Sequence, residues 1–286
     1  MTVDLLLVTC ADWPEGEPGG HLLVDDLAAR GVVARWLRWD DPHVDWRAAA
    51  VVAVRSTWDY ERRCEEFLQW ARAVGPGLLN GAETMAWNVD KAYLLDLAGA
   101  GLAVVPTVTA DDPGSVAAAV TRFGRAVAKP RVGAGGRGVR CFEGTVAEGV
   151  LDAATGPWVV QPLVESVRTE GETSVFVVGG RAAAQVSKRP ADGEIRVHEQ
   201  YGGITSPVSL QPAAAGLAEQ TVRVVERLRG TAVEYARVDM LRLADGSLAV
   251  SELEAVEPGL YLEVLPTLAA TFGAMVERVL AAGRRP

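Results

Sequence analysis

The feature that most constrains this chain is a pair of apolar segments within residues 235–254, joined by Asp245-Gly246. This dipeptide favours the two-residue turn of a β-hairpin. With the turn centred there, Asp239 lies directly opposite Glu252, and Glu254 projects from the same face because side chains alternate along a strand. The pattern therefore predicts three carboxylates at one end of a hairpin face. The rest of that face would carry Leu241, Leu243, Leu248 and Val250.

Three clustered carboxylates need an explanation, because like charges placed opposite each other destabilise a sheet. A bound cation would remove the repulsion, and Mg²⁺ suits a site built from one or two carboxylates and phosphate oxygens. The alternative is an acidic strand end exposed to solvent. Two lysines and a glycine-rich loop earlier in the chain favour the metal site.

The glycine-rich loop, residues 132–139, lies between two segments of strand character and follows Lys129. Its backbone N–H groups can fold over phosphates. It matches neither the P-loop nor the dinucleotide-binding pattern, because both of those lead into a helix. A mobile turn is the alternative interpretation. The four glycines are Gly133, Gly135, Gly136 and Gly138.

Lys91 falls in the first turn of a helix expected over residues 87–98, with Asn88 as its N-cap. The helix dipole disfavours a cation at that position. Lys91 is therefore either a solvated side chain or one directed at an anion such as a phosphate.

Residues 5–8, 32–38 and 50–54 have the apolar character of buried strands, and residues 21–30 that of a helix. This alternation predicts a small parallel, doubly wound sheet, in which ligands bind at the carboxyl ends of the strands. A polar run follows the third strand and is a candidate site for a small zwitterion, unless it only caps a helix. Its candidate substrate residues are Arg55, Ser56, Thr57 and Asp59.

The C-terminal half is expected to begin with antiparallel strands over residues 170–178, 181–188 and 194–199. An amphipathic helix over residues 213–229 follows, and after the hairpin a last helix ends near residue 282. The three expected strands carry the charged or titratable residues Glu172, Lys188, Arg196 and His198.

Composition excludes several classes of protein. The net charge of −9 argues against a nucleic-acid binder, which needs Lys and Arg to neutralise phosphates. The 3 cysteines are too few and too scattered for a disulfide framework or a zinc site. The first residues lack the pattern of a signal peptide, and no apolar run is long enough for a membrane span. We therefore expect a cytoplasmic protein with a small-molecule partner, and a homodimer is compatible with these features.

Taken in order, these motifs resemble those of the ATP-grasp superfamily across essentially the whole chain. Glu254 departs from the family pattern, in which Asn often provides the last metal ligand, so the number of metal ions is left open. The matching residues are Lys91, Ala128-Lys129-Pro130 before the glycine loop, the hinge at residues 161–164, Arg196 ahead of Gly202 and Gly203, and Asp239 with Glu252 and Glu254.

The resemblance implies an α/β fold with α+β architecture in the ATP-grasp part. Residues 1–104 would form a Rossmann-like substrate domain, residues 105–164 a small ATP-binding lobe with the glycine flap, and residues 165–286 an antiparallel-sheet lobe with the metal site. It also implies ATP and Mg²⁺ as cofactors, an acylphosphate formed from a substrate carboxylate, and release of ADP.

The same resemblance assigns roles to residues around the nucleotide. Lys91 and Lys129 would hold phosphates beneath the four flap glycines, and Glu172 would contact the ribose. Asp239, Glu252 and Glu254 would bind Mg²⁺. The adenine would lie against Gln161, Pro162, Leu163 and Val164.

Roles in catalysis and substrate binding also follow from the resemblance. Arg196 would stabilise the phosphoryl group in transfer, with Lys129 and His198 as further catalytic candidates. The amino-acid-like substrate would contact Arg55, Ser56, Thr57, Asp59, Arg196, Gly202 and Gly203.

Within the superfamily, residues 55–60, 79–80, 90–94 and 105–107 are most similar to the D-cycloserine-forming cyclo-ligases, which act on O-ureido-D-serine in antibiotic biosynthesis. We therefore expect an ADP-forming carboxylate–amine ligase, with ring closure of an amino-acid derivative as one form. A ligase joining two amino acids in a linear amide and a non-catalytic ATP-binding protein are the alternatives. A Rossmann-type dehydrogenase is excluded because no G-x-G-x-x-G follows the first strand.

Overall fold

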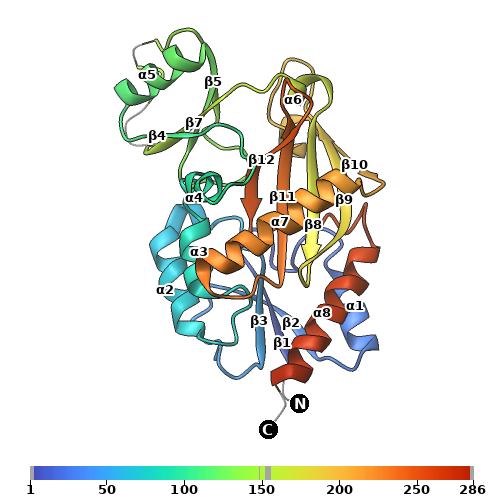
Figure 1. Cartoon of the computed structure of the whole chain (residues 1–286). Helices are drawn as coiled ribbons and strands as arrows, with labels where there is room; N and C mark the ends of the chain where they lie inside the picture. Colours follow the sequence, from blue (N-terminus) through green and yellow to red (C-terminus); the bar gives the residue numbers. More distant parts are fainter. Residues whose placement is uncertain (1–2, 148, 152–155, 284–286) are drawn as a thin grey trace.

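The computed structural model describes residues 3–147, 149–151 and 156–283. The chain forms sheets of three, four and five strands (Figure 1). These sheets lie within residues 5–56, 108–162 and 172–254, and the three-domain division made from the sequence stays a prediction. Among the described residues, no helix combines the length and the apolar character needed to cross a membrane.

The N-terminal sheet is parallel, as the alternation of segments predicts, with the strand order β2-β1-β3. Both faces of β1 are buried. Leu5 and Leu7 pack with α1 and α8, whereas Leu6 and Val8 pack with α2 and α3. The elements are β1 (Leu5–Thr9), β2 (Ala34–Arg38), β3 (Val51–Ser56), α1 (His21–Ala29), α2 (Cys64–Val74), α3 (Ala82–Asn88) and α8 (Thr267–Gly283), with a 3₁₀ turn, η1 (Tyr60–Arg63).

The middle sheet is antiparallel and has the order β4-β7-β5-β6. Helix α5 packs on it, and Asp112 caps that helix by accepting a hydrogen bond from the Ser115 backbone N–H at 2.8 Å. The elements are α4 (Tyr93–Gly99), β4 (Val108–Ala110), α5 (Pro113–Phe123), β5 (Arg125–Pro130), β6 (Arg140–Glu143) and β7 (Trp158–Pro162).

The C-terminal sheet is also antiparallel and has the order β10-β9-β8-β11-β12. Helix α7 runs across one face, and α8 contacts β8 and β9 and lies along α1 (Figure 1). The last helix therefore joins the C-terminal sheet to the N-terminal one. The elements are α6 (Ser166–Thr169), β8 (Glu172–Val178), β9 (Arg181–Arg189), η3 (Glu199–Tyr201), β10 (Ile204–Val208), α7 (Pro212–Arg229), β11 (Tyr235–Arg242) and β12 (Leu248–Glu254).

The β11–β12 hairpin pairs Asp239 with Glu252, as predicted, but its turn length and the regularity of its strands differ from the prediction. The turn holds three residues, because the Leu243 N–H donates to the Ser247 carbonyl at 2.8 Å. A bulge beside Asp239 then restores the predicted pairing. As a consequence, the prediction that Leu248 and Val250 share the carboxylate face is wrong. They pair with Arg242 and Met240 and pack on the α7 side of the sheet.

Two further local predictions are wrong because side chains engage the backbone. Asn88 ends α3 instead of opening a helix, since its amide bonds the Leu253 carbonyl and the Ala255 N–H. Residues 194–199 do not form a strand, since the Glu194 carboxylate accepts the N–H groups of Ile195 and Arg196. The edge strand beside β9 is β10 instead.

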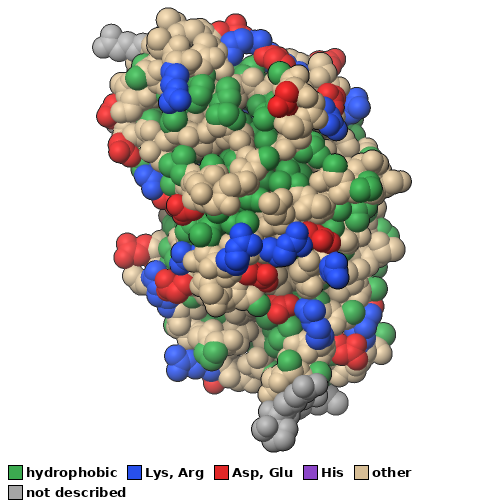
Figure 2. Space-filling view, in the orientation of Figure 1, with side chains coloured by type: hydrophobic (Ala, Val, Ile, Leu, Met, Phe, Trp, Pro, Cys, Tyr) green, Lys and Arg blue, Asp and Glu red, His purple; other side chains and the backbone are tan. Residues whose placement is uncertain are grey.

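The face of the molecule drawn in Figure 2 carries acidic and basic side chains interspersed with one another. Apolar side chains show in the hollow between the middle sheet and the rest of the molecule (Figures 1 and 2).

Candidate functional site

We call the glycine-rich loop, residues 132–139, the flap. It connects β5 to β6 and borders two adjoining cavities. The first cavity has a volume of about 120 Å³ and the second a volume of about 540 Å³. Both are lined by Ala134, Gly135, Arg137, His198, Glu254 and Glu257.

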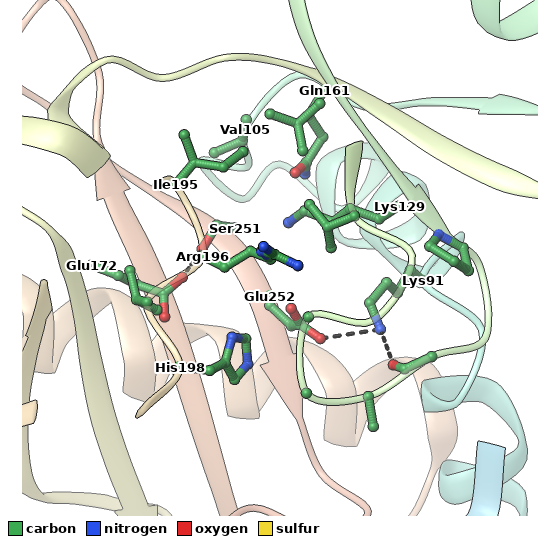
Figure 3. A pocket seen from close by; sticks show the side chains of 18 of the residues that line it. Lys91, Val105, Lys129, Gln161, Glu172, Ile195, Arg196, His198, Ser251 and Glu252 are labelled. Carbon is green, nitrogen blue, oxygen red and sulfur yellow. Dashed lines mark hydrogen bonds and ion pairs between the residues drawn. The ribbon is translucent and has the colours of Figure 1, made fainter. Parts of the chain in front are cut away.

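The first cavity collects most of the residues predicted to bind a nucleotide. Figure 3 shows Val105 and Ile195 at one end and Lys91 and Glu252 at the other, so an apolar end suits a base and a charged end suits phosphates. The predicted residues on its wall are Lys91, Lys129, Gly133, Gly135, Gly136, Gln161, Pro162, Leu163, Val164, Glu172, Arg196, His198, Glu252 and Glu254. The predicted residues on the wall of neither cavity are Arg55, Ser56, Thr57, Asp59, Gly138, Gly202, Gly203 and Asp239.

Lys91 lies in the turn between α3 and α4, where its backbone N–H donates to the Arg131 carbonyl at 2.8 Å. Its Nζ is 3.2 Å from a Glu252 carboxylate oxygen and donates to the Gly133 carbonyl at 2.7 Å (Figure 3). Burial lowers the pKa of Lys91, but the carboxylates of Glu252, Glu257 and Glu254 together raise it overall. Lys91 is therefore a cation that ties β12 to the flap.

Arg196 lies on the wall of the first cavity in a loop stabilised by its own neighbours. Its guanidinium pairs with Glu194 and stacks over the Tyr201 ring at 3.6 Å from the ring centre. The hydrogen bond from Arg196 lowers the pKa of Glu194 to about 2. Gly203 is required by the same loop, because a Cβ there would collide with the Val197 carbonyl oxygen. Gly202 and Gly203 thus shape the loop and do not reach the cavities.

His198 contributes to the walls of both cavities. Burial, followed by the neighbouring Lys188 charge, lowers the pKa of His198 to about 4. The imidazole is therefore neutral near pH 7 and is a weak base.

The acidic end of the hairpin holds two basic residues that sequence reasoning did not assign. Arg237 donates to both Asp239 oxygens, at 2.9 and 2.8 Å, and also to Glu254. Lys188 lies 3.2 Å from Glu172 and 3.5 Å from Asp239. Glu172, predicted to contact the ribose, is thus already engaged by Lys188. Lys188 is the cross-strand partner of Glu172 on β8, and Arg237 is that of Glu254 on β12, so cross-strand pairing could have found both.

Glu252 and Glu254 project from β12 to the cavity wall, and Asp239 lies behind them. Burial raises the pKa of Glu254 to about 7. Repulsion from Asp239 and Glu252 adds to this rise, and the Arg237 charge offsets it only in part. A divalent cation would relieve that repulsion, so these two carboxylates fit Mg²⁺ shared with phosphate oxygens. By themselves, no three His, Cys, Asp or Glu side chains within the described part of the chain are arranged to hold a metal ion.

The role predicted for Arg55 needs correction. Arg55 is 0% exposed, and its Nη2 donates to Glu17 at 2.7 Å and to the Pro258 carbonyl at 2.6 Å. Its guanidinium also packs against the rings of Tyr235 and Phe272. A side chain enclosed in this way has no surface left for a substrate. Arg55 instead fastens the N-terminal sheet to the segment after β12.

The other predicted substrate residues of this motif are also internal. Ser56 donates to the Thr9 hydroxyl at 2.8 Å, and Asp59 accepts the indole N–H of Trp39 at 3.0 Å. Thr57 is fully buried. Two residues of the 55–60 motif do reach a cavity: Tyr60 lines the first one and Trp58 lines the second.

The flap is held from both sides. From η1, Glu61 accepts the Ala134 backbone N–H at 2.6 Å and pairs with Arg137. From η3, the Gln200 side chain donates to the Gly135 carbonyl. At the far end of the flap, Gly138 packs so closely on Pro130 that a Cβ would lie 2.7 Å from the proline ring.

Besides the flap, His198 and Glu254, the second cavity is built from loop residues to which sequence reasoning assigned no role. Its walls come from the loop after β1, from Trp58 and Arg62, from the flap, and from residues 257–264. Trp13 and Trp58 meet edge to face with ring centres 5.3 Å apart, and the Trp58 indole donates to the Glu257 carbonyl oxygen at 3.2 Å. Tyr261 adds a third aromatic ring and has the positive φ of 52° that is uncommon for its residue type.

Comparison with known proteins finds a cycloserine biosynthesis enzyme that is similar over nearly the whole chain. Residues 5–80 match the family described as D-cycloserine synthetase DcsG, N-terminal domain. The chain is 31% identical over 277 residues to the cycloserine biosynthesis protein DcsG of Streptomyces lavendulae, covering 90% of this chain and 92% of that protein. The crystal structure of D-cycloserine synthetase DcsG matches with a TM-score of 0.85 and 29% identity, covering 96% of this chain and 99% of the other.

More distant similarities extend to other ligases. A probable alpha-L-glutamate ligase of Thioalkalivibrio sulfidiphilus is 30% identical over 136 residues, covering 43% of this chain and 42% of that protein. The ATP-grasp ligase PsnB, complexed with a precursor variant, Mg and ADP, has a TM-score of 0.67 at 16% identity, covering 99% of this chain and all of the other. The PsnB match concerns the fold.

Proposed function

Because this chain belongs to the family of D-cycloserine synthetase DcsG and is an ATP-grasp ligase, we propose that it joins a carboxylate to an amine with ATP and Mg²⁺ as cofactors. The substrate carboxylate would take the γ-phosphoryl group of ATP, giving an acylphosphate and ADP. The nitrogen nucleophile would then displace phosphate and form the C–N bond. In the cyclo-ligase form, acid and nucleophile belong to one amino-acid derivative such as O-ureido-D-serine.

The observation that carries this proposal is the convergence of Lys91, Lys129 and Arg196 on one cavity beside Glu252 and the flap. The two lysines would hold phosphates as point charges, and the flap backbone would cover them. Arg196 would stabilise charge on the transferring phosphoryl group. The hinge at residues 161–164 would receive the adenine, at the apolar end of the cavity.

Glu252 and Glu254 would hold Mg²⁺, which when bound neutralises charge on the phosphates. Asp239 would join them only if Arg237 released it, so we assign it the indirect role of orienting Arg237 and Glu254. The acid substrate would occupy the second cavity. That cavity meets the charged end of the first one at Glu254 and His198.

The test measures release of ADP and phosphate from Mg-ATP with a panel of acids, including O-ureido-D-serine and pairs of D- and L-amino acids. Release with O-ureido-D-serine alone would identify a cyclo-ligase, and release only with two partners a linear ligase. Lys129→Ala should lower kcat by about 10²–10³-fold, the loss typical of removing one electrostatic contact to the transition state. Arg181→Ala, on the exposed start of β9, is the control. Full turnover by Lys129→Ala would refute the nucleotide site.

A linear amide ligase is the second candidate. It is favoured by the similarity to the glutamate ligase and by the volume of the second cavity, about 540 Å³, which falls within the roughly 300–1,000 Å³ typical of sites for drug-sized ligands. ATP binding without ADP release for any acid would instead favour the non-catalytic ATP-binding protein.

A further inference from the structure

Among the carboxylates that line the second cavity, that of Glu257 is both buried and without an ion-pair partner in the described part of the chain. Glu257 follows β12, is 6% exposed and lies on the wall shared by the two cavities. Within the described residues, its carboxylate takes part in no ion pair and accepts no hydrogen bond from another residue. A buried carboxylate is costly to leave without a compensating cation.

The cations of the cavity wall are already engaged elsewhere. Arg62 lies 3.7 Å from Asp12, and Arg137 pairs with Glu61. Arg237 is held by Asp239 and Glu254. Lys91 shares the wall of the first cavity with Glu257, but it pairs with Glu252. Burial, with repulsion from Glu254, raises the pKa of Glu257 to about 8, although Lys91 lowers it. No basic side chain among the described residues makes an ion pair with Glu257, so a cationic group of a ligand would stabilise its charged form.

The surroundings of Glu257 select the kind of cation. The Trp58 indole is fixed against its backbone carbonyl, Trp13 packs on Trp58, and Tyr261 lies on the same cavity wall. Indole and phenol rings attract ammonium groups through their faces, and a carboxylate accepts charge-assisted hydrogen bonds from them.

We infer that Glu257 binds the protonated amino group of the substrate within the aromatic wall of the second cavity. This inference rests on the proposed function and names the residue that selects an amino-acid substrate over an acid without an amino group. Because Glu257 lies where the two cavities meet, an acid anchored there stays close to the charged end of the first cavity. Trp58 and the Arg55–Glu17 pair act as positioning residues, since they hold the backbone at residues 257–260.

The experiment uses pairs of acids that differ only in the amino group: O-ureido-D-serine with 3-(ureidooxy)propanoate, and D-alanine with propanoate, the second pair assayed with the same excess of a separate amine as nucleophile. For the wild-type chain, kcat/KM should favour the amine-bearing member by at least about tenfold, equivalent to about 1.4 kcal/mol. Glu257→Gln keeps the shape of the side chain and should reduce that preference to about twofold or less. Glu263→Gln, an exposed position on the same cavity wall, is the matched control and should keep the full preference.

Three results would overturn the inference: an amine preference that survives Glu257→Gln, wild-type turnover that does not distinguish the pairs, or a variant that changes only the Mg²⁺ concentration needed for activity. Thermal unfolding of each variant shows whether the fold is intact. If no acid yields ADP, the proposed function fails. Calorimetric binding of the same pairs then tests Glu257 separately, and equal affinity within each pair overturns the inference.

Discussion

Two strand ends in this molecule carry similar polar sequences but have opposite environments. At the end of β3, the Arg55 guanidinium is enclosed by Glu17, a backbone carbonyl and two aromatic rings. At the end of β12, Glu252 and Glu254 open onto cavities. The difference lies in the supply of countercharge. At β3, one carboxylate pairs with one guanidinium, and both side chains are buried. At β12, the carboxylates outnumber the basic side chains near them, and a cavity remains that a cationic or metal-bound ligand could fill.

The largest effect should come from breaking the closed strand end. Arg55→Ala leaves Glu17 buried without its partner, and we expect a loss of about 3–5 kcal/mol in the free energy of unfolding. Glu252→Gln, at the open strand end, should reduce ADP formation and leave stability within about 1 kcal/mol. Urea unfolding and turnover assays on both variants check this. A stable Arg55→Ala variant with impaired substrate binding would show that the end of β3 binds ligand, as the end of β12 does, and would contradict the structural role of Arg55.

An intermediate effect is expected at Glu61, where the segment after the closed strand end contacts the flap. The first cavity, about 120 Å³, is smaller than the roughly 300–1,000 Å³ typical of ligand sites, so we expect the flap to open when a nucleotide binds. Glu61→Ala removes the contacts to Ala134 and Arg137 and should favour the open flap by about 1.5 kcal/mol, or about tenfold. Tryptic cleavage at Arg137 in the nucleotide-free protein measures this.

The matched control for Glu61 is Glu65→Ala, one turn further on in α2, where the carboxylate contacts only Gln69 among the described residues. Cleavage at Arg137 should be unchanged in that variant. Equal cleavage in the Glu61 and Glu65 variants would show that the flap is not held by Glu61.

The smallest effect concerns His198. Its pKa is about 4 in the folded protein against an ordinary value of 6.5, so the unfolded chain binds the proton first as the pH falls. Stability should therefore decrease between about pH 6.5 and pH 4, and His198→Asn should lower proton uptake on unfolding by up to about one proton near pH 5. Urea unfolding at several pH values measures this slope. If the slope is the same in His198→Asn and in the wild type, His198 is not buried in its neutral form. Activity of His198→Asn at pH 7 should fall only a few-fold.

The sequence predicted the features that depend on local order along the chain. Lys91, Lys129 and the flap glycines could be assigned because their order resembles a known family. The Asp239–Glu252 pair was found although the turn length was wrong, since the bulge and the longer turn compensate. Strand alternation alone cannot detect two such irregularities when they cancel.

The environment of Arg55 could not be predicted, because its partner Glu17 lies 38 residues away in a loop without periodic pattern. The second cavity was missed for the same reason. Its walls combine loops from both ends of the chain, and only the folded arrangement brings Trp13, Trp58 and Glu257 together. Polar residues at strand ends mark candidate sites, but the distant residues that neutralise them decide which candidates stay open.

The contact between Arg55, Glu17 and residues 258–260 also bears on how such enzymes can be recombined. The backbone beside Glu257 is shaped by two side chains from the other end of the chain. An N-terminal domain exchanged between relatives would therefore carry part of the substrate specificity with it, and a chimera would need a matching 257–261 segment. Diversification of this scaffold is expected to proceed by coordinated change at both termini and not by swapping of independent modules.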